Sequence, residues 1–274
     1  MKLLALGVLI MGLSTDAMAL NRKDHILTAT TVADVQQALS TLNEDAVIFI
    51  DVDDTLITPE SKVFHWSSPY RFLIDDLKKN KDKYPNFETI LSHWRLQRKT
   101  MLVSKDWPAF IEALKQKYPV YALTKMDSGP LGDIPSMEKW RYDELESKGI
   151  SFTPTYDGIS EAVVATDPAK PSPATFYKGI FISGPLNKSN VLRAYFNTKQ
   201  PAQIVLIDDR AEYLEDAIQE CNRHHIPFLG ILFKGMDLIP GAPDPAVAEF
   251  QKETLFEKGE WLEDKEAEAL LKGE

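Results

Sequence analysis

Two pairs of acidic residues each follow an apolar run that has the composition of a buried strand. Asp51 and Asp53 end the first of these runs, and Asp208 and Asp209 end another one later in the chain. In open parallel sheets, ligands bind beyond the carboxyl ends of the strands, so we expect both pairs at one edge. Mg²⁺ binds through one or two carboxylates together with waters or phosphate oxygens. The spacing therefore predicts one shared magnesium site whose further ligand is a phosphate.

Short apolar runs and helical stretches alternate along most of the chain. Runs of about five residues that are rich in Val, Ile, Leu or Phe are typical of strands covered on both faces. They are Ala46–Ile50, Val120–Leu123, Gly179–Ser183, Ile204–Ile207 and Phe228–Phe233. The helical stretches are Thr31–Leu42, Met137–Lys148, Lys188–Phe196 and Glu212–His224. This alternation indicates parallel β-α units and predicts a Rossmann-like α/β core with a parallel sheet.

One interval, residues 57–118, is too long for a simple crossover between two of these strands. It has helical periodicity in Tyr70–Lys79, Phe87–Leu102 and Trp107–Lys117. We interpret it as a small helical cap inserted after the first core strand, so that residues 20–56 and 119–274 form the core. Residues 151–178 read as a loop with several prolines, and the tail after Lys234 as solvated surface helices.

The first 19 residues have the pattern of an export signal. Lys2 supplies a positive start, Leu3–Leu13 is apolar, and Ala17-Met18-Ala19 fits a cleavage site. A buried N-terminal helix is the alternative. The apolar stretch is shorter than the roughly 20 residues that a membrane span needs, and no later segment is long enough. We therefore expect an exported protein, periplasmic or secreted, without a stable membrane anchor.

The formal charge of −10 disfavours nucleic acid as a partner, because an acidic surface repels a phosphate backbone. It leaves room for a local basic pocket that binds one small phosphate. The sequence gives no indication of the oligomeric state.

Four segments together resemble the motifs of the haloacid dehalogenase (HAD) superfamily, in the same order. The first is Asp51-Val52-Asp53-Asp54-Thr55, which directly follows a strand. Tyr121–Thr124 resembles the second motif, Lys188–Leu192 the third and Leu206–Asp209 the fourth. The resemblance extends from about residue 44 to residue 235, and its first and fourth motifs are the most specific.

The resemblance implies a role for each matching side chain. Asp51 would attack phosphorus and form an aspartyl-phosphate. Asp53 would protonate the leaving oxygen and then deprotonate the attacking water. Thr124 would donate a hydrogen bond to a phosphoryl oxygen, and Lys188 would offset the negative charge of Asp51 and the phosphate. Other lysines compete for this last role, and they are Lys125, Lys170 and Lys178.

The same resemblance implies a metal centre that holds Mg²⁺. Asp51, the backbone carbonyl of Asp53 and Asp209 would be its ligands, with Asp208 acting through a water. Aromatic residues and an arginine in residues 63–71 would either line the leaving-group pocket or form the core of the cap. The sequence leaves both possibilities open.

We therefore expect an exported Mg²⁺-dependent phosphatase that hydrolyses a small phosphomonoester. The signal, the short insert and the Asp-Asp-Arg ending at residues 208–210 resemble a branch of the superfamily found in intracellular bacterial pathogens. That branch has no settled substrate, so the resemblance implies none. Asp53 disfavours dehalogenation, since dehalogenases of the superfamily lack this second acid. Phosphotransfer, phosphomutase activity, or a catalytically weak binding or effector role on the same fold are the alternatives.

Overall fold

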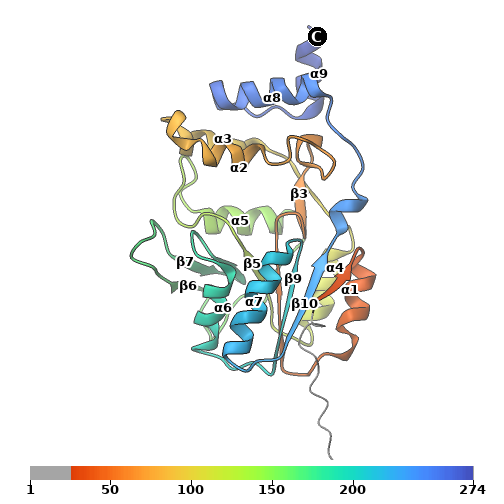
Figure 1. Cartoon of the computed structure of the whole chain (residues 1–274), viewed down its shortest axis with the longest axis vertical. Helices are drawn as coiled ribbons and strands as arrows, with labels where there is room; N and C mark the ends of the chain where they lie inside the picture. The colour runs from red at the N-terminus through yellow and green to blue at the C-terminus, as the bar shows by residue number, and fades with distance from the viewer. Residues whose placement is uncertain (1–25, 274) are drawn as a thin grey trace, which may run out of the picture.

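The computed structural model describes residues 26–273, and its centre is an eight-stranded sheet (Figure 1). The strand order is β1-β10-β9-β2-β5-β8-β7-β6. The first six strands in this order, which end with β8, all run parallel to their neighbours. At the edge, β7 pairs antiparallel with β8, and β6 pairs antiparallel with β7. Their bounds are Ile26–Ala29 (β1), Ala46–Ile50 (β2), Val120–Thr124 (β5), Glu161–Ala165 (β6), Ala174–Tyr177 (β7), Ile180–Ile182 (β8), Gln203–Asp208 (β9) and Phe228–Phe233 (β10). The mixed α/β architecture with a mostly parallel central sheet agrees with the predicted Rossmann-like class.

Helices cover both faces of the sheet. On one face are α1 and α4, and on the other are α6 and α7 (Figure 1). Strand β2 shows why both faces must be covered, because its side chains alternate between two apolar clusters. Val47 and Phe49 pack with residues of α6 and α7, whereas Ile48 and Ile50 pack with residues of α1 and α4. The bounds are Val32–Ala38 (α1), Trp107–Lys115 (α4), Lys188–Phe196 (α6) and Ala211–Arg223 (α7).

A separate layer of helices lies beyond the carboxyl ends of the parallel strands (Figure 1). We call α2, α3, α8 and α9 the outer helices; α5 lies between them and the sheet. Strands β3 and β4 form an antiparallel pair that connects α2 and α3 to the core. The bounds are Ile57–Pro59 (β3), Leu73–Lys79 (α2), Phe87–Gln97 (α3), Thr100–Leu102 (β4), Met137–Glu146 (α5), Pro245–Lys258 (α8) and Asp264–Lys272 (α9). Single 3₁₀ turns occur at Leu39–Thr41, Lys62–Phe64, Lys81–Lys83 and Gly235–Leu238.

The C-terminal tail belongs to the outer helices rather than to the solvated surface that the sequence predicted. Ala248 and Leu255 of α8 are fully buried. Trp261 packs on Phe64, with ring centroids 5.4 Å apart. The tail therefore covers α3 and the segment before α2 with apolar contacts. The prediction of a surface helix was wrong because the partner surface lies far away in sequence.

Residues 151–178 were predicted as a loop, yet they contain β6 and β7. Strand β6 is at the edge of the sheet and most of its side chains are partly exposed. A strand of this kind lacks the continuous apolar run by which the buried strands were found. Within residues 57–118, helix α4 packs on the sheet through Trp107 and Ile111, apart from the outer helices. The predicted division into core and insert stays a prediction.

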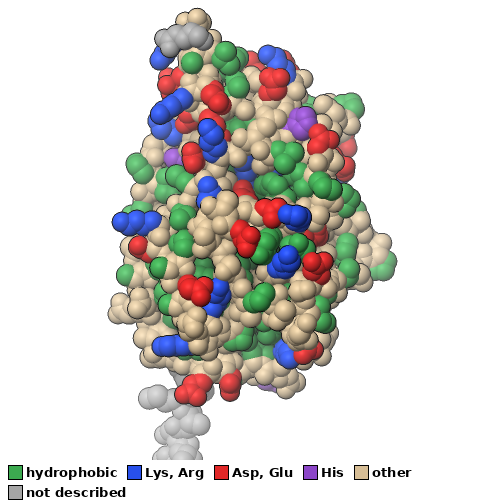
Figure 2. Space-filling view, turned by 180° about the vertical axis from the view of Figure 1, so that it is seen from behind, with side chains coloured by type: hydrophobic (Ala, Val, Ile, Leu, Met, Phe, Trp, Pro, Cys, Tyr) green, Lys and Arg blue, Asp and Glu red, His purple; other side chains and the backbone are tan. Residues whose placement is uncertain are grey.

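The predicted export signal, residues 1–19, lies outside the described residues. Within residues 26–273, no helix combines the length and the apolar character needed to span a bilayer. Figure 2 shows acidic and basic side chains interspersed over the face seen from behind. The formal charge of the chain is therefore not gathered into one acidic area on that face.

Candidate functional site

Three carboxylates converge at the carboxyl ends of two neighbouring strands. Ile50 of β2 pairs with Ile207 of β9, so the next residues, Asp51 and Asp208, lie side by side. The Asp51 N–H donates to the Ile207 carbonyl at 2.8 Å and extends this pairing by one residue. One carboxylate oxygen each from Asp51, Asp208 and Asp209 lies within 4.8 Å of the others. The register of two parallel strands thus brings together three of the four acids that the sequence predicted at one edge.

Lys188 lies between two of these acids. It opens helix α6, whose start is fixed by the Asn187 N–H donating to the side chain of Asn190 at 3.0 Å. Its Nζ donates to Asp51 Oδ1 at 2.5 Å and to Asp208 Oδ2 at 2.6 Å. The side chain is only 1% exposed, so these two acids are what keeps a buried ammonium stable.

Burial and the charges of the neighbouring groups both shift the pKa values in this cluster. Burial raises the pKa of Asp51 to about 7, an effect that Lys188 opposes and Asp208 reinforces. Burial, Asp51 and Asp208 together raise the pKa of Asp209 to about 8. Burial alone would lower the pKa of Lys188, but Asp208 and Asp51 hold it above its usual value, so this residue stays charged. One lysine thus faces three carboxylates.

A hard divalent cation fits this donor set. All three converging groups offer oxygen, and a cation among them would offset the burial and the mutual repulsion that raise the pKa of Asp51 and Asp209. Such a site keeps positions for water or phosphate, since three carboxylates do not complete an octahedral shell. The arrangement therefore has the chemistry that the predicted Mg²⁺ site requires.

Asp53 does not join this cluster. Its carboxylate accepts two hydrogen bonds from Arg141 Nη2, at 2.7 and 2.9 Å, and Arg98 lies 3.9 Å away. Although burial opposes ionisation, Arg141 and Arg98 hold the pKa of Asp53 below its usual value. The chain turns directly after Asp53, where Asp54 adopts a left-handed φ of 62°. Its side chain accepts a hydrogen bond from Thr58 at 2.9 Å.

A cavity of about 320 Å³ opens onto the cluster and is lined by Asp51, Asp53, Thr124 and Asp209. Thr124 is the last residue of β5 and is fully buried. Among residues 26–273, its hydroxyl oxygen has no hydrogen-bond partner. A buried hydroxyl is rarely left unpaired, so this group is available to a ligand. The structure thus brings four of the predicted side chains to one cavity, whereas Lys188 and Asp208 are buried and do not line it.

The three competing lysines lie in different places. Lys125 also lines the cavity, but its Nζ donates to the carbonyl oxygens of Gly184 and Leu186, at 3.2 and 2.5 Å. These hydrogen bonds fix the backbone of residues 184–186, which precede α6. Lys170 is exposed, and Lys178 lies over the rings of Tyr142 and Tyr177. Of the four candidates, Lys188 alone bonds to Asp51 in the described part of the chain.

The sequence-based reasoning missed a second group beside the first. Arg95, Arg98 and Arg141 line an adjoining cavity of about 210 Å³ together with Arg71 and Trp94. Arg95 and Arg98 are on or just after α3, and Arg141 is on α5, so they are far apart in sequence. The one available signal is the Trp-Arg dipeptide, which occurs at residues 94–95 and again at residues 140–141.

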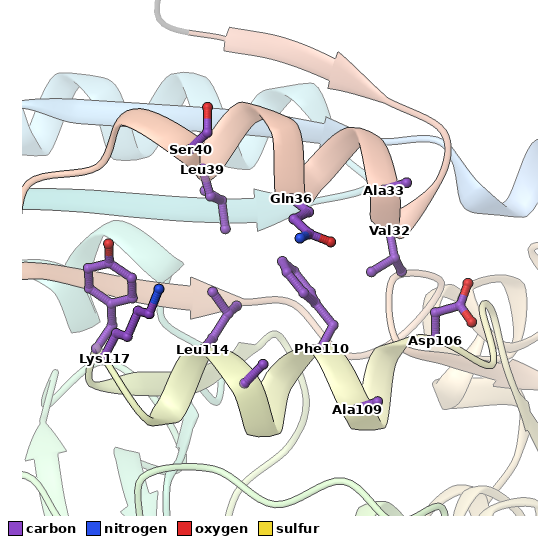
Figure 3. A pocket seen from close by; sticks show the side chains of 12 residues that line it. Val32, Ala33, Gln36, Leu39, Ser40, Asp106, Ala109, Phe110, Leu114 and Lys117 are labelled. Atoms are coloured by element: carbon purple, nitrogen blue, oxygen red, sulfur yellow. The ribbon is translucent and has the colours of Figure 1, made fainter.

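A larger cavity of about 640 Å³ lies between α1 and α4, away from these residues (Figure 3). Phe110 of α4 points toward Gln36 of α1, and Leu114 points toward Leu39, which directly follows α1. Its lining includes one acid and one lysine, and the rest is apolar, polar without charge, or aromatic. Size alone would favour this cavity as a binding site, but the converging charged groups are in the smaller ones. We therefore take the acid cluster as the candidate functional site.

Comparison with known proteins assigns the chain to a protein family. A family model described as "Protein of unknown function (DUF2608)" matches residues 28–268. The "Uncharacterized protein RP296" of Rickettsia prowazekii (strain Madrid E) is 28% identical over 247 residues, which cover 86% of this chain and 87% of that protein. No solved structure matches the chain. Because the family model spans most of the chain and all the site residues described above, the protein belongs to the DUF2608 family.

Proposed function

We propose that this protein is an exported, HAD-type phosphohydrolase that uses Asp51 as a nucleophile on a small phosphomonoester, with Mg²⁺ as cofactor. The observation that carries the proposal is the position of Lys188, which bonds to both Asp51 and Asp208 at the ends of adjacent strands. An ammonium in that place lets an anionic nucleophile approach an anionic phosphate. The outer helices, which lie beyond this edge of the sheet, would act as the cap that restricts access.

The reaction would take place in two steps. A carboxylate oxygen of Asp51 forms a bond to phosphorus as the bond from phosphorus to the leaving oxygen breaks. Water then attacks the aspartyl-phosphate, which releases phosphate and restores the Asp51 carboxylate. Throughout, Lys188 stays charged beside Asp51, and the free hydroxyl of Thr124 donates to a phosphoryl oxygen.

The magnesium ion would be held by Asp51, Asp209, the backbone carbonyl of Asp53 and, through a water, Asp208. When bound, it supplies positive charge that offsets the charge of the phosphoryl group. These ligands are the oxygen donors of the acid cluster together with one carbonyl from the adjoining turn.

Asp53 would act as general acid in the first step and as general base in the second. Its hydrogen bonds to Arg141 suit only the second of these roles. A general acid must carry a proton, but Arg141 holds the pKa of Asp53 low in the present conformation. Asp53 must therefore leave Arg141 before it protonates the leaving oxygen. The ionised form that is bonded to Arg141 is the form needed to deprotonate the attacking water.

The test is phosphate release from 4-nitrophenyl phosphate by the purified mature protein, with Mg²⁺ and with EDTA. We expect activity with Mg²⁺, loss of activity with EDTA, and loss of activity in Asp51→Asn. The matched control is Asp45→Asn, because Asp45 is exposed at the opposite end of the same strand. Activity that survives both Asp51→Asn and EDTA would overturn the proposal, as would the absence of hydrolysis on a panel of phosphomonoesters.

A further inference from the structure

The cavity lined by the arginines is next to the nucleophile and carries the opposite charge. Its cationic lining residues are Arg71, Lys78, Arg95, Arg98, Lys125 and Arg141, whereas its acids are Asp53, Asp54 and Asp75. Asp127 and Glu144 also pair with these arginines, and the cations still outnumber the acids. A local excess of positive charge is notable in a chain whose formal charge is −10.

Two buried N–H groups at this cavity have no acceptor among residues 26–273. They are Nε of Arg98 and Nε1 of Trp94. The Arg98 side chain is only 4% exposed, so water does not replace the missing acceptor freely. Buried donors of this kind are rare in folded proteins, and a ligand that brings acceptor oxygens would satisfy them.

The three buried or half-buried arginines are also held close to one another. Arg95, Arg98 and Arg141 all lie over the ring of Trp140, at 5.8, 5.4 and 5.1 Å from its centroid. Burial, opposed by Asp127, lowers the pKa of Arg95, and the charges of Arg98 and Arg141 lower it further. Bringing guanidinium groups together costs free energy through repulsion, and an anion between them removes that cost.

This cavity shares Asp53, Asp54, Asp75, Lys78 and Lys125 with the cavity that contains Asp51. A substrate whose phosphoryl group is at Asp51 would therefore place its leaving group among the arginines. The volume of about 210 Å³ limits that leaving group to a small one.

We propose that this cavity binds a second anionic group, a carboxylate or a phosphate, on the leaving group of a small phosphomonoester. The inference rests on the proposed phosphatase function and adds the substrate class. Arg95 and Arg98 would bind the second anion, because guanidinium groups match the planar geometry of a carboxylate and the oxygens of a phosphate. Neutral esters of the same size would leave the buried donors unpaired and would be poorer substrates.

The experiment compares three esters that differ only at the far end. They are 2-carboxyethyl phosphate, its neutral amide 2-carbamoylethyl phosphate, and 2-phosphonoethyl phosphate. We measure kcat/KM for each with Mg²⁺ in the wild type, in Arg95→Gln and in Arg98→Lys. The control is Arg223→Gln, whose side chain is 59% exposed on α7, outside both cavities.

We expect the wild type to prefer at least one of the anionic esters over the amide by about 10-fold or more. The preferred anion identifies the group as carboxylate or phosphate. The preference should fall toward unity in Arg95→Gln, fall partly in Arg98→Lys, and persist in Arg223→Gln. Hydrolysis of all three esters at equal rates would overturn this inference alone. Hydrolysis of none of them, nor of 4-nitrophenyl phosphate, would overturn the phosphatase proposal and this inference with it.

Discussion

Two groups of buried charges in this protein differ in the ratio of acidic to basic side chains. At the acid cluster, one lysine faces Asp51, Asp208 and Asp209, and the pKa values of the acids are raised. In the second group, one acid faces two cations, because Glu220 of α7 accepts hydrogen bonds from two arginines. The acids of the first group follow or end strands β2 and β9 and its lysine opens α6, whereas the second group joins α6 to α7. In the first group one cation contacts the acids, and in the second two cations contact a single acid.

The Glu220 group is complete by itself. Arg193 donates two hydrogen bonds to Glu220 at 2.8 Å, and Arg223 donates a third at 2.6 Å. Hydrogen bonds from Arg193 lower the pKa of Glu220 to about 2, despite burial. The group therefore stabilises the contact between α6 and α7 and requires no ligand. In the acid cluster, by contrast, burial and mutual repulsion both raise the pKa of Asp209, and a bound cation would offset both. That difference favours the acid cluster as the candidate site.

The largest effect should follow from Lys188→Met. The substitution removes the charge between Asp51 and Asp208, and we expect phosphatase activity to fall by about 10³-fold. The matched control is Lys199→Met, because Lys199 makes a surface ion pair with Asp157 and lies outside the cavity. Phosphate release under saturating Mg²⁺ measures the effect. Equal activity of the two variants would show that Lys188 has no part in the reaction.

A smaller effect should follow from Asp209→Asn. This variant removes one of three converging carboxylates but leaves Asp51 and Lys188 in contact. We expect the Mg²⁺ concentration for half-maximal activity to rise by about 10- to 100-fold, with activity partly restored at high Mg²⁺. Titration of activity with Mg²⁺ measures the shift. An unchanged Mg²⁺ dependence would remove Asp209 from the metal site.

Glu220→Gln should change stability and leave activity intact. Because the folded pKa of Glu220 lies below its ordinary value of 4.5, its contribution is present above about pH 4.5 and is lost as the pH falls toward about 2. Solvent screens the two arginines, which are about half exposed, so we expect a loss of about 2 kcal/mol at pH 7.

Urea unfolding of both proteins at pH 7 and at pH 3 measures this loss. The difference between wild type and Glu220→Gln should shrink at the lower pH. A difference that is equal at both pH values, or a loss of activity in the folded variant, would break the contrast between the two charge groups.

Much of the core was predictable, because its strands are buried on both faces. The expected bounds of Ala46–Ile50 and Phe228–Phe233 agree with β2 and β10, and the predicted Lys188–Phe196 helix agrees with α6. Local composition suffices for such elements. The meeting of Asp51 with Asp208 was also predictable, since parallel strands bring their carboxyl ends to one edge.

The rest depends on contacts between distant segments. The packing of Trp261 on Phe64 has no local signature. The repeated Trp-Arg dipeptide marks Arg95 and Arg141 but does not indicate that they meet. The orientation of Asp53 is a further example. Its position in the motif implied a place beside the nucleophile, but Arg141 on α5 draws its side chain toward the arginines. Tertiary packing determines this side-chain orientation, and the residues around Asp53 in the sequence do not predict it.

The central claim, covalent catalysis by Asp51, is tested most directly by trapping the intermediate. The protein is mixed with substrate and Mg²⁺, quenched, and treated with borohydride, which reduces an aspartyl-phosphate to homoserine. Peptide mass spectrometry should find homoserine at position 51, and Lys188→Met should yield far less of it. Rapid phosphate release with an unmodified Asp51, or with homoserine at another aspartate, would contradict the account.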